Sequence, residues 1–401
     1  MSEAVENQVP LPAPAAVESV GAIFVTFLQQ GATAFGGPVA QIAALEQRFV
    51  SQRGWVDAQR FRRALAVFQA LPGPEATEMC VWLGMVRRGR LGALAAGLGF
   101  LLPGLLLAWA VAWLYGAREL TPAWRSAFTG MQAVLCALLV RAVLRIGSRC
   151  VVDPTGLFLA LGAAATAALG TPALLALAAT GLVHACWQRG RAQAALLAAA
   201  LPLAWSLLVP APTLVVEAGT ALPPAQAADL LALARTGIEC GLLTFGGAYT
   251  ALPFLHESAV GNGWVGEQAF WDGAAIVHVL PAPLVVLGTF LGQVAGGVPG
   301  ALVVSLGIFA PAFVLAMVGH RWSERIALAP GLHAFLDGVA IGVTGLFGLV
   351  VVDALAATLG TWTGWVLLPL AAWFLRRYPH PALPLLLLPT TGLVGLLLGP
   401  H

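Results

Sequence analysis

Apolar stretches without charged residues recur along almost the whole chain, from Val17 to Leu398. Many are close to the roughly 20 residues with which an α-helix crosses the hydrocarbon core of a bilayer. Hydropathy alone separates about 13 such segments. The pattern predicts an all-α polytopic membrane protein, with the lipid bilayer as its main surroundings.

Composition agrees with this pattern and excludes several functions. Only 9% of the residues are charged, the mean hydropathy is +0.87, and a soluble protein has about 25% charged residues. Every basic residue is arginine. Without lysine there is neither a P-loop lysine nor a Schiff-base lysine, so an ion gradient, the membrane potential or another subunit must drive any pumping. We expect no nucleic-acid partner and no cofactor.

An internal repeat divides the chain into two related halves. The matching motifs, in order, are 31–37 with 241–247, Gly54-Trp55-Val56 with Gly263-Trp264-Val265, Leu71-Pro72-Gly73-Pro74 with Leu280-Pro281-Ala282-Pro283, and Gly92-Ala93-Leu94 with Gly300-Ala301-Leu302. Shared order over a long stretch indicates duplication. We predict a polar tail at 1–16, a first transporter repeat at 17–212, a linker at 213–226 and a second repeat at 227–401.

The arginines predict that the two halves have opposite orientations in the membrane. Cytoplasmic loops are rich in Lys and Arg. In the first half, arginines flank residues 57–88 on both sides, whereas the matching stretches 248–270 and 293–300 contain none. This asymmetry indicates an inverted-topology repeat. It also predicts a re-entrant hairpin of two short apolar arms at 57–88, and a mirrored one at 267–295.

Glycine and proline motifs interrupt the apolar segments and predict broken helices. Irregular backbone at membrane depth persists only where it is buried in protein or lines a cavity, and helix N-termini bind anions. We therefore predict substrate-binding segments at these breaks; packing glycines and simple kinks are the alternative. The predicted binding residues are Phe35, Gly36, Gly37, Pro38, Pro72, Gly73, Pro74, Phe245, Gly246, Gly247, Pro281 and Pro283.

Ionisable residues inside apolar segments are the candidates for ion coupling. Such residues are costly in a membrane and are functional by default; solvation at an interface is the alternative. They are Glu75, Glu78, Asp272, His278, Asp337 and Asp353. Arg60, Arg62 and Arg63 are candidates for a cytoplasmic mouth that attracts anions, or are topology determinants only. The scattered histidines predict no metal site.

Three motifs and the matching segments of the second half resemble those of a known family. Phe35-Gly36-Gly37-Pro38, Gly54-Trp55-Val56 and Leu71-Pro72-Gly73-Pro74 resemble the chromate ion transporters, in their long two-domain form. This resemblance implies a secondary transporter in the bacterial inner membrane that exports chromate and confers chromate resistance. Ala248 stands where the first half has Pro38, so the two halves are expected to differ toward the anion.

Two alternatives to chromate export stay open at this point. Sulfate or another oxyanion is an alternative substrate, because chromate and sulfate are dianions of similar shape. A membrane-embedded enzyme is an alternative of another class, although no nucleophile–base or metal constellation is apparent. Whether the chain forms a homodimer is also left open.

Overall fold

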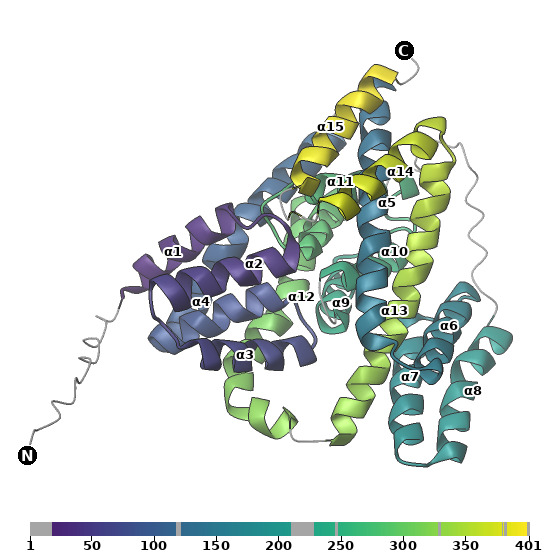
Figure 1. Cartoon of the computed structure of the whole chain (residues 1–401), viewed down its shortest axis with the longest axis horizontal. Helices are drawn as coiled ribbons and strands as arrows, with labels where there is room; N and C mark the ends of the chain where they lie inside the picture. Colours follow the sequence, from purple (N-terminus) through teal and green to yellow (C-terminus); the bar gives the residue numbers. More distant parts are fainter. Residues whose placement is uncertain are drawn as a thin grey trace, which may run out of the picture.

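The computed structural model describes residues 18–117, 122–209, 228–244, 248–327, 330–378, 380 and 383–398. The predicted tail (1–16), the predicted linker (213–226) and the Phe245-Gly246-Gly247 motif lie outside these residues. Within them every regular element is a helix. Figure 1 shows the α1–α4 group on one side, the long α5 and α13 on the other, and α9–α12 between them.

The two halves use the same succession of helices. The first contains α1 (Val20–Ala32), α2 (Gly37–Leu45), the π-helix η1 (Glu46–Gln52), α3 (Ala58–Ala70), α4 (Glu75–Ala117), α5 (Pro122–Cys150), α6 (Pro154–Ala168), α7 (Ala173–Gln188) and α8 (Ala192–Leu208). The second contains α9 (Leu230–Leu243), η2 (Ala248–Ala251), α10 (Leu252–Ala259), α11 (Glu267–Val277), η3 (Leu284–Val286), α12 (Leu287–Ala327), α13 (Pro330–Leu359), α14 (Trp362–Arg377) and α15 (Leu383–Leu398).

Local chemistry sets the helix boundaries around the predicted breaks. Ser19 and Asp57 cap α1 and α3, each accepting a hydrogen bond from a backbone N–H in the first turn. Gly36 and Gly37 have φ of 89° and 78°, a region that disfavours other residues, and Pro38 stands in the first turn of α2. The predicted break at Phe35-Gly36-Gly37 is confirmed.

Helices α4 and α12 are each folded back on themselves at matched positions. Arg88 and Gly89 have φ/ψ of −147°/34° and 59°/−151°; Gly296 and Gly297 repeat them with −142°/18° and 60°/−155°. Residues on either side of each fold touch: a Cβ on Gly84 would lie 2.2 Å from the carbonyl oxygen of Gly92. Residues this far apart cannot touch along a straight helix. Both elements are therefore helical hairpins with glycine at the contact between the arms.

The second-half hairpin is built in the same way. Ideal Cβ positions on Gly292 and Gly300 approach each other's carbonyl oxygens to 2.6 and 2.3 Å. Only glycine allows backbones to come this close, which is how small residues join helices in lipid. The shared dihedrals and shared contacts confirm the predicted duplication.

The matched helices α5 and α13 run in opposite directions alongside each other (Figure 1). Cys136 interacts with Thr358, whereas Gly147, further along α5, lies beside Thr344, earlier in α13. Each of these helices also packs on two helices of the other half: α5 on α14 and α15, and α13 on α6 and α7. Antiparallel matched helices confirm the predicted inverted repeat.

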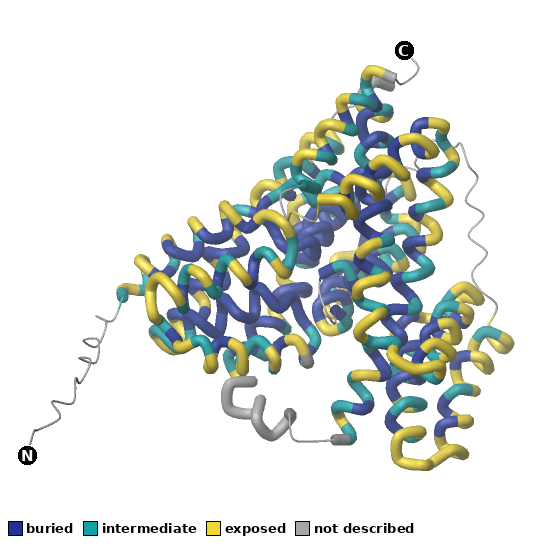
Figure 2. Tube along the Cα trace, in the orientation of Figure 1, coloured by how far each residue is buried: buried dark blue, intermediate teal, exposed yellow. Residues whose placement is uncertain are grey.

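The outer surface is apolar in both halves. Leu94, Leu98 and Leu106 of α4 are exposed, and so are their matched residues Leu302, Leu306 and Val314 of α12. Figure 2 shows the exposed positions on the outside of the molecule and the buried ones along its centre. Such large apolar surfaces are unsuited to water and suited to lipid. Among the described residues, four helical stretches are long and apolar enough to cross a bilayer: Glu75–Ala117, Trp124–Cys150, Leu284–Val318 and Gly331–Leu359. The first and third of them include the folds at Gly89 and Gly297.

One sequence prediction about the first hairpin is wrong. Both arms around Pro72–Pro74 were expected to be apolar, but α3 exposes Arg60, Arg62 and Arg63 while burying Phe61 and Phe68. Its spacing of charged and aromatic residues produces an amphipathic helix. The second arm, from Glu75 to the fold at Arg88, is apolar and buried as expected.

Candidate functional site

The proline tip of the first half meets the helix break of the second half. The N–H of Gly73 donates to the carbonyl oxygen of Thr244 at 2.8 Å. Thr244 is the residue before Phe245, and its hydroxyl caps the end of α9 by donating to the Cys240 carbonyl at 2.6 Å. We call the contact between Gly73 and Thr244 the junction. Two motifs about 170 residues apart along the chain thus come together in space.

A buried acid lies directly at the junction. Gly73 has φ of 148°, and a Cβ there would lie 2.5 Å from Oε1 of Glu78. The exposed fraction of Glu78 is 0%, and neither of its carboxylate oxygens has a hydrogen-bond partner in the described part of the chain. A Cβ at Gly73 would require the Glu78 carboxyl group to move, and the positive φ also favours glycine.

Glu75 stands about one turn before Glu78 on α4, in a different environment. It is 8% exposed, the Gln69 side chain hydrogen-bonds to it, and Arg149 of α5 is close enough to interact electrostatically. The two acids that the sequence grouped together therefore differ: Glu75 has polar partners and Glu78 has none among the described residues.

On the other side of the second break, Tyr249 of η2 faces His278. The tyrosine hydroxyl lies 3.3 Å from Nε2 of His278, and Nδ1 of His278 lies 2.9 Å from the Ala274 carbonyl oxygen. Because that carbonyl can only accept, Nδ1 carries the proton in the neutral ring. The Tyr249 ring also stacks on Phe347 of α13, with centroids 6.4 Å apart.

Three arginines of α5 follow one another along the helix and interact with Tyr249 or Glu75. Arg141, Arg145 and Arg149 recur every fourth residue, so they lie along one face of the helix. The first two interact electrostatically with Tyr249, and the third with Glu75. All three residues are exposed. An exposed arginine inside a long apolar helix is costly next to lipid, which indicates that this face borders water or protein.

A second polar centre lies between the halves at Asp272 of α11. Its Oδ2 accepts from the Tyr115 hydroxyl at 2.8 Å, and its Oδ1 accepts from Gln132 at 2.8 Å and Gln268 at 3.0 Å. Tyr115 and Gln132 belong to the first half. Asp272 is fully buried, and three donors satisfy it, as a buried carboxyl group requires.

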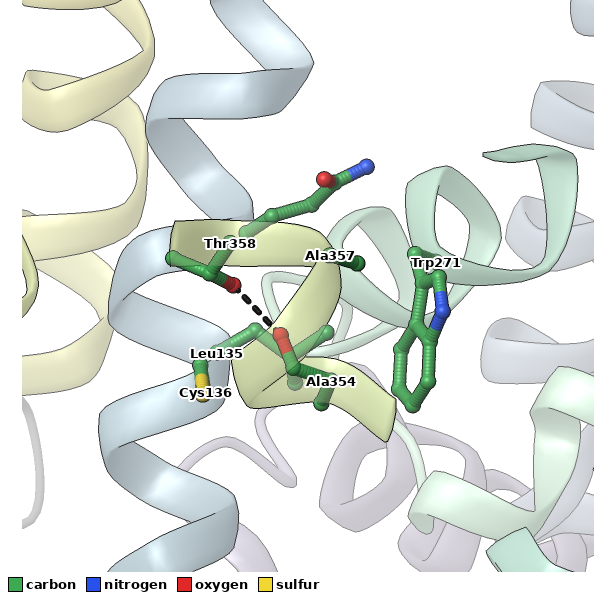
Figure 3. Close-up of a pocket in the computed structure, with 7 residues that line it drawn as sticks. Leu135, Cys136, Trp271, Ala354, Ala357 and Thr358 are labelled. Carbon is green, nitrogen blue, oxygen red and sulfur yellow. Dashed lines mark hydrogen bonds between the residues drawn. The ribbon is translucent and has the colours of Figure 1, made fainter. Parts of the chain in front are cut away.

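Figure 3 shows the small pocket beside this centre, between α5, α11 and α13. Trp271 faces it from α11, and Leu135 and Cys136 from α5. The Thr358 hydroxyl donates its proton back to the Ala354 carbonyl at 2.7 Å, so only its acceptor side faces other groups. The walls are mostly apolar, and the pocket contains no cluster of charge.

Among the described residues, the other predicted motif residues form no hydrogen bond with Gly73 or Thr244. Phe35 is 39% exposed, and no hydrogen bond among the described residues joins residues 35–38 to either tip. The second tip, at Pro281 and Pro283, packs its Ala282 against Gly104 of α4. Phe245, Gly246 and Gly247 lie outside the described residues.

The outlying charged candidates are dispersed. Asp337 is exposed near Cys150, and Asp353 lies near His256 and Glu267. Arg60, Arg62 and Arg63 occupy the exposed face of α3. Whether any of the predicted residues binds substrate stays a prediction.

Tyr249, Tyr115, Gln132 and the α5 arginines are not among the site residues predicted from the sequence. The four-residue spacing of the arginines inside an apolar segment was a signal that could have indicated a polar helix face. Nothing in the local sequence marks the others: Tyr115 and Gln132 bind Asp272 of the opposite half, and Tyr249 binds His278, 29 residues further along the chain.

These features define a class: a polytopic all-α membrane transport protein, built from two inverted repeats with broken helices at the contact between them. The family model described as "Chromate transporter" matches residues 21–185 and 231–397. The chain belongs to this family, and it is a transporter and not an enzyme.

Curated relatives extend over most of the chain. A chromate transport protein of Pseudomonas aeruginosa is 45% identical over 84% of this chain and 81% of its own length. A probable chromate transport protein of Synechococcus elongatus is 28% identical over 81% of this chain and 82% of its own length. A chromate transport protein of Cupriavidus metallidurans is 27% identical over 82% of this chain and 81% of its own length. No solved structure was found to match the chain.

Proposed function

We propose that this protein is a secondary transporter that exports chromate from the cytoplasm across the bacterial inner membrane and thereby confers chromate resistance. The observation that carries the proposal is the row of exposed arginines on α5, which leads to the junction. The names of the three relatives supply chromate as the substrate.

The charge pattern suits a small dianion. Arg141, Arg145 and Arg149 extend over about 12 Å along α5, at 1.5 Å per residue. Guanidinium groups match oxyanions, since they present several N–H donors in one plane. A row of guanidinium groups raises the local anion concentration, so that an anion moves from one arginine to the next without a single tight binding site.

The opposite half does not repeat this row. At the matched positions, α13 has Leu349, Asp353 and Ala357. The C-terminal end of α5, which carries the arginine row, is followed along the chain by Arg189 and Arg191. The positive-inside rule assigns these arginines to the cytoplasm. The positive face therefore serves the cytoplasmic side, where an exporter must collect its substrate.

Inverted vesicles test the proposal, because their accessible face is the cytoplasmic one. Energised vesicles with the wild-type chain should accumulate radiolabelled chromate. Arg145→Gln should raise the chromate KM several-fold with normal protein levels. Arg235→Gln is the matched control, since Arg235 is exposed on α9 and pairs only with Glu239 among the described residues.

Three results would contradict the proposal. Equal KM for both variants would remove the arginine row from the substrate path. Accumulation of sulfate with only weak competition by chromate would identify a sulfate carrier instead. Absence of chromate and sulfate uptake by correctly inserted protein would reject oxyanion export.

A further inference from the structure

Glu78 is the one described acidic side chain that is fully buried and has no hydrogen-bond partner on either oxygen. Asp272, the other fully buried acid in the described ranges, has three donors. A carboxylate that leaves water without donors or a counter-charge loses much of its favourable solvation. With no donor among the described residues, Glu78 avoids this cost by holding a proton.

We propose that Glu78 is a proton-binding site whose occupation is linked to the transported oxyanion, so that anion binding at the junction takes up one proton. This inference rests on the proposed function, since it concerns the same site. Glu78 lies at the junction: its carboxyl group is next to Gly73, and the Gly73 N–H donates to the Thr244 carbonyl.

The charges around Glu78 do not offer it a counter-ion. Glu75 is the charged group that interacts with it, and that interaction is repulsive. Arg149 acts on Glu75. No titratable residue occurs in four elements that pack on α4, namely α1, α2, η3 and the first arm of α12. Helix α3 also packs on α4, but its arginines are exposed near the start of the helix. Across the junction, the titratable groups are Cys240 of α9, whose carbonyl accepts from the Thr244 hydroxyl, and Tyr249 and His278, with Arg141 and Arg145 near Tyr249.

Electrostatics gives the sign of the linkage. An ionised Glu78 would add a negative charge at the junction and repel a dianion, whereas the neutral acid would not. The anion therefore favours the protonated form, and protonation favours the anion by the same free energy. The second half has Leu284 and Leu287 at the positions that mirror Glu75 and Glu78, so this proton site occurs once per chain.

The test is chromate binding to the purified full chain by calorimetry, at alkaline pH values where chromate is the dianion. Repeating the titration in buffers of different ionisation heat measures proton uptake. The wild type should take up about one proton per anion, and its apparent Kd should rise about tenfold per pH unit above the range in which Glu78 titrates.

Glu78→Gln should bind chromate without proton uptake and with a Kd that no longer depends on pH. Glu239→Gln is the matched control, because Glu239 pairs with Arg235 on the surface of α9, away from the junction, and this variant should keep the proton uptake. If Glu78→Gln does not fold, infrared difference spectra of the wild type and Glu239→Gln replace it. Chromate should then raise the protonated carboxylic acid band in both.

The outcomes separate the two proposals. Chromate binding by the wild type without proton uptake, or equal uptake in Glu78→Gln, overturns the proton site and leaves oxyanion transport intact. If infrared spectra replace the variant, an unchanged acid band on chromate binding overturns it equally. No chromate binding by the folded wild type overturns both.

Discussion

Gly31 is a sharp test of how the repeats hold their helices together. It lies in α1, where a Cβ would be 2.1 Å from the carbonyl oxygen of Phe100 in α4. Ordinary contact begins at 3.4 Å, so Gly31→Ala must separate the two backbones by about 1.3 Å. The obstructing atom belongs to the backbone and cannot rotate away.

Two opposing effects determine how much Gly31→Ala changes the free energy of unfolding. Alanine gains about 1 kcal/mol over glycine in a helix. Overpacking a fitted contact costs about 1–3 kcal/mol, and a rigid backbone obstacle favours the upper part of that range. We therefore expect Gly31→Ala to lower the free energy of unfolding by about 1–2 kcal/mol.

Gly21→Ala on the same helix is the control, since nothing lies within 4 Å of its ideal Cβ. It should leave stability unchanged or raise it by up to about 1 kcal/mol. Thermal unfolding in one detergent, followed by tryptophan fluorescence, compares the variants. Gly241→Ala should behave like Gly31→Ala, because the matched contact with Ile308 is 2.3 Å. Equal melting temperatures for Gly31→Ala and Gly21→Ala would refute the close-packing argument.

Three further predictions concern the tip, the buried polar centre and the surface. Gly73→Ala should abolish chromate uptake in vesicles that contain the folded protein, because the new Cβ would lie 2.5 Å from Oε1 of Glu78. Gly54→Ala is the control, since Gly54 has φ of 59° but open space around it; this variant should keep chromate uptake and lose about 1 kcal/mol of stability. Tyr115→Phe should cost about 1.5–3 kcal/mol in thermal unfolding, because Asp272 loses one of three donors; a cost near zero would mean that water replaces the hydroxyl. Glu18→Gln should change stability by less than about 1 kcal/mol, because its ion pairs with Arg53 and Arg87 are 3.6 and 3.9 Å long and partly exposed; a larger loss in unfolding experiments would indicate a coupled network.

Much of the fold could be predicted from local features of the sequence. The helix breaks at Gly36-Gly37 and Pro72–Pro74 follow from backbone preferences that glycine and proline carry wherever they stand. The opposite orientation of the halves follows from arginine bias, which acts through the charge of each loop. The amphipathic character of α3 was also present in its spacing, but the prediction of two apolar arms overlooked it.

The candidate site was predictable only in part. The sequence marked Pro72, Gly73, Pro74, Glu75 and Glu78, because prolines and acids stand out in an apolar segment. It could not tell Glu75 from Glu78, since their difference lies in Gln69, Arg149 and the space beside Gly73.

The membrane class, the duplication, the inverted orientation and the positions of the breaks follow from the order of residues along the chain, because hydropathy, loop charge and backbone preference are properties of short segments. Three further features appear only in the folded chain: the tip of one half meets the break of the other, α5 and α13 pack on helices of the opposite half, and Asp272 has donors whereas Glu78 has none among the described residues. In lipid, helices associate through close packing and specific hydrogen bonds. Those contacts join residues far apart along the chain, and no local pattern records which pairs will meet.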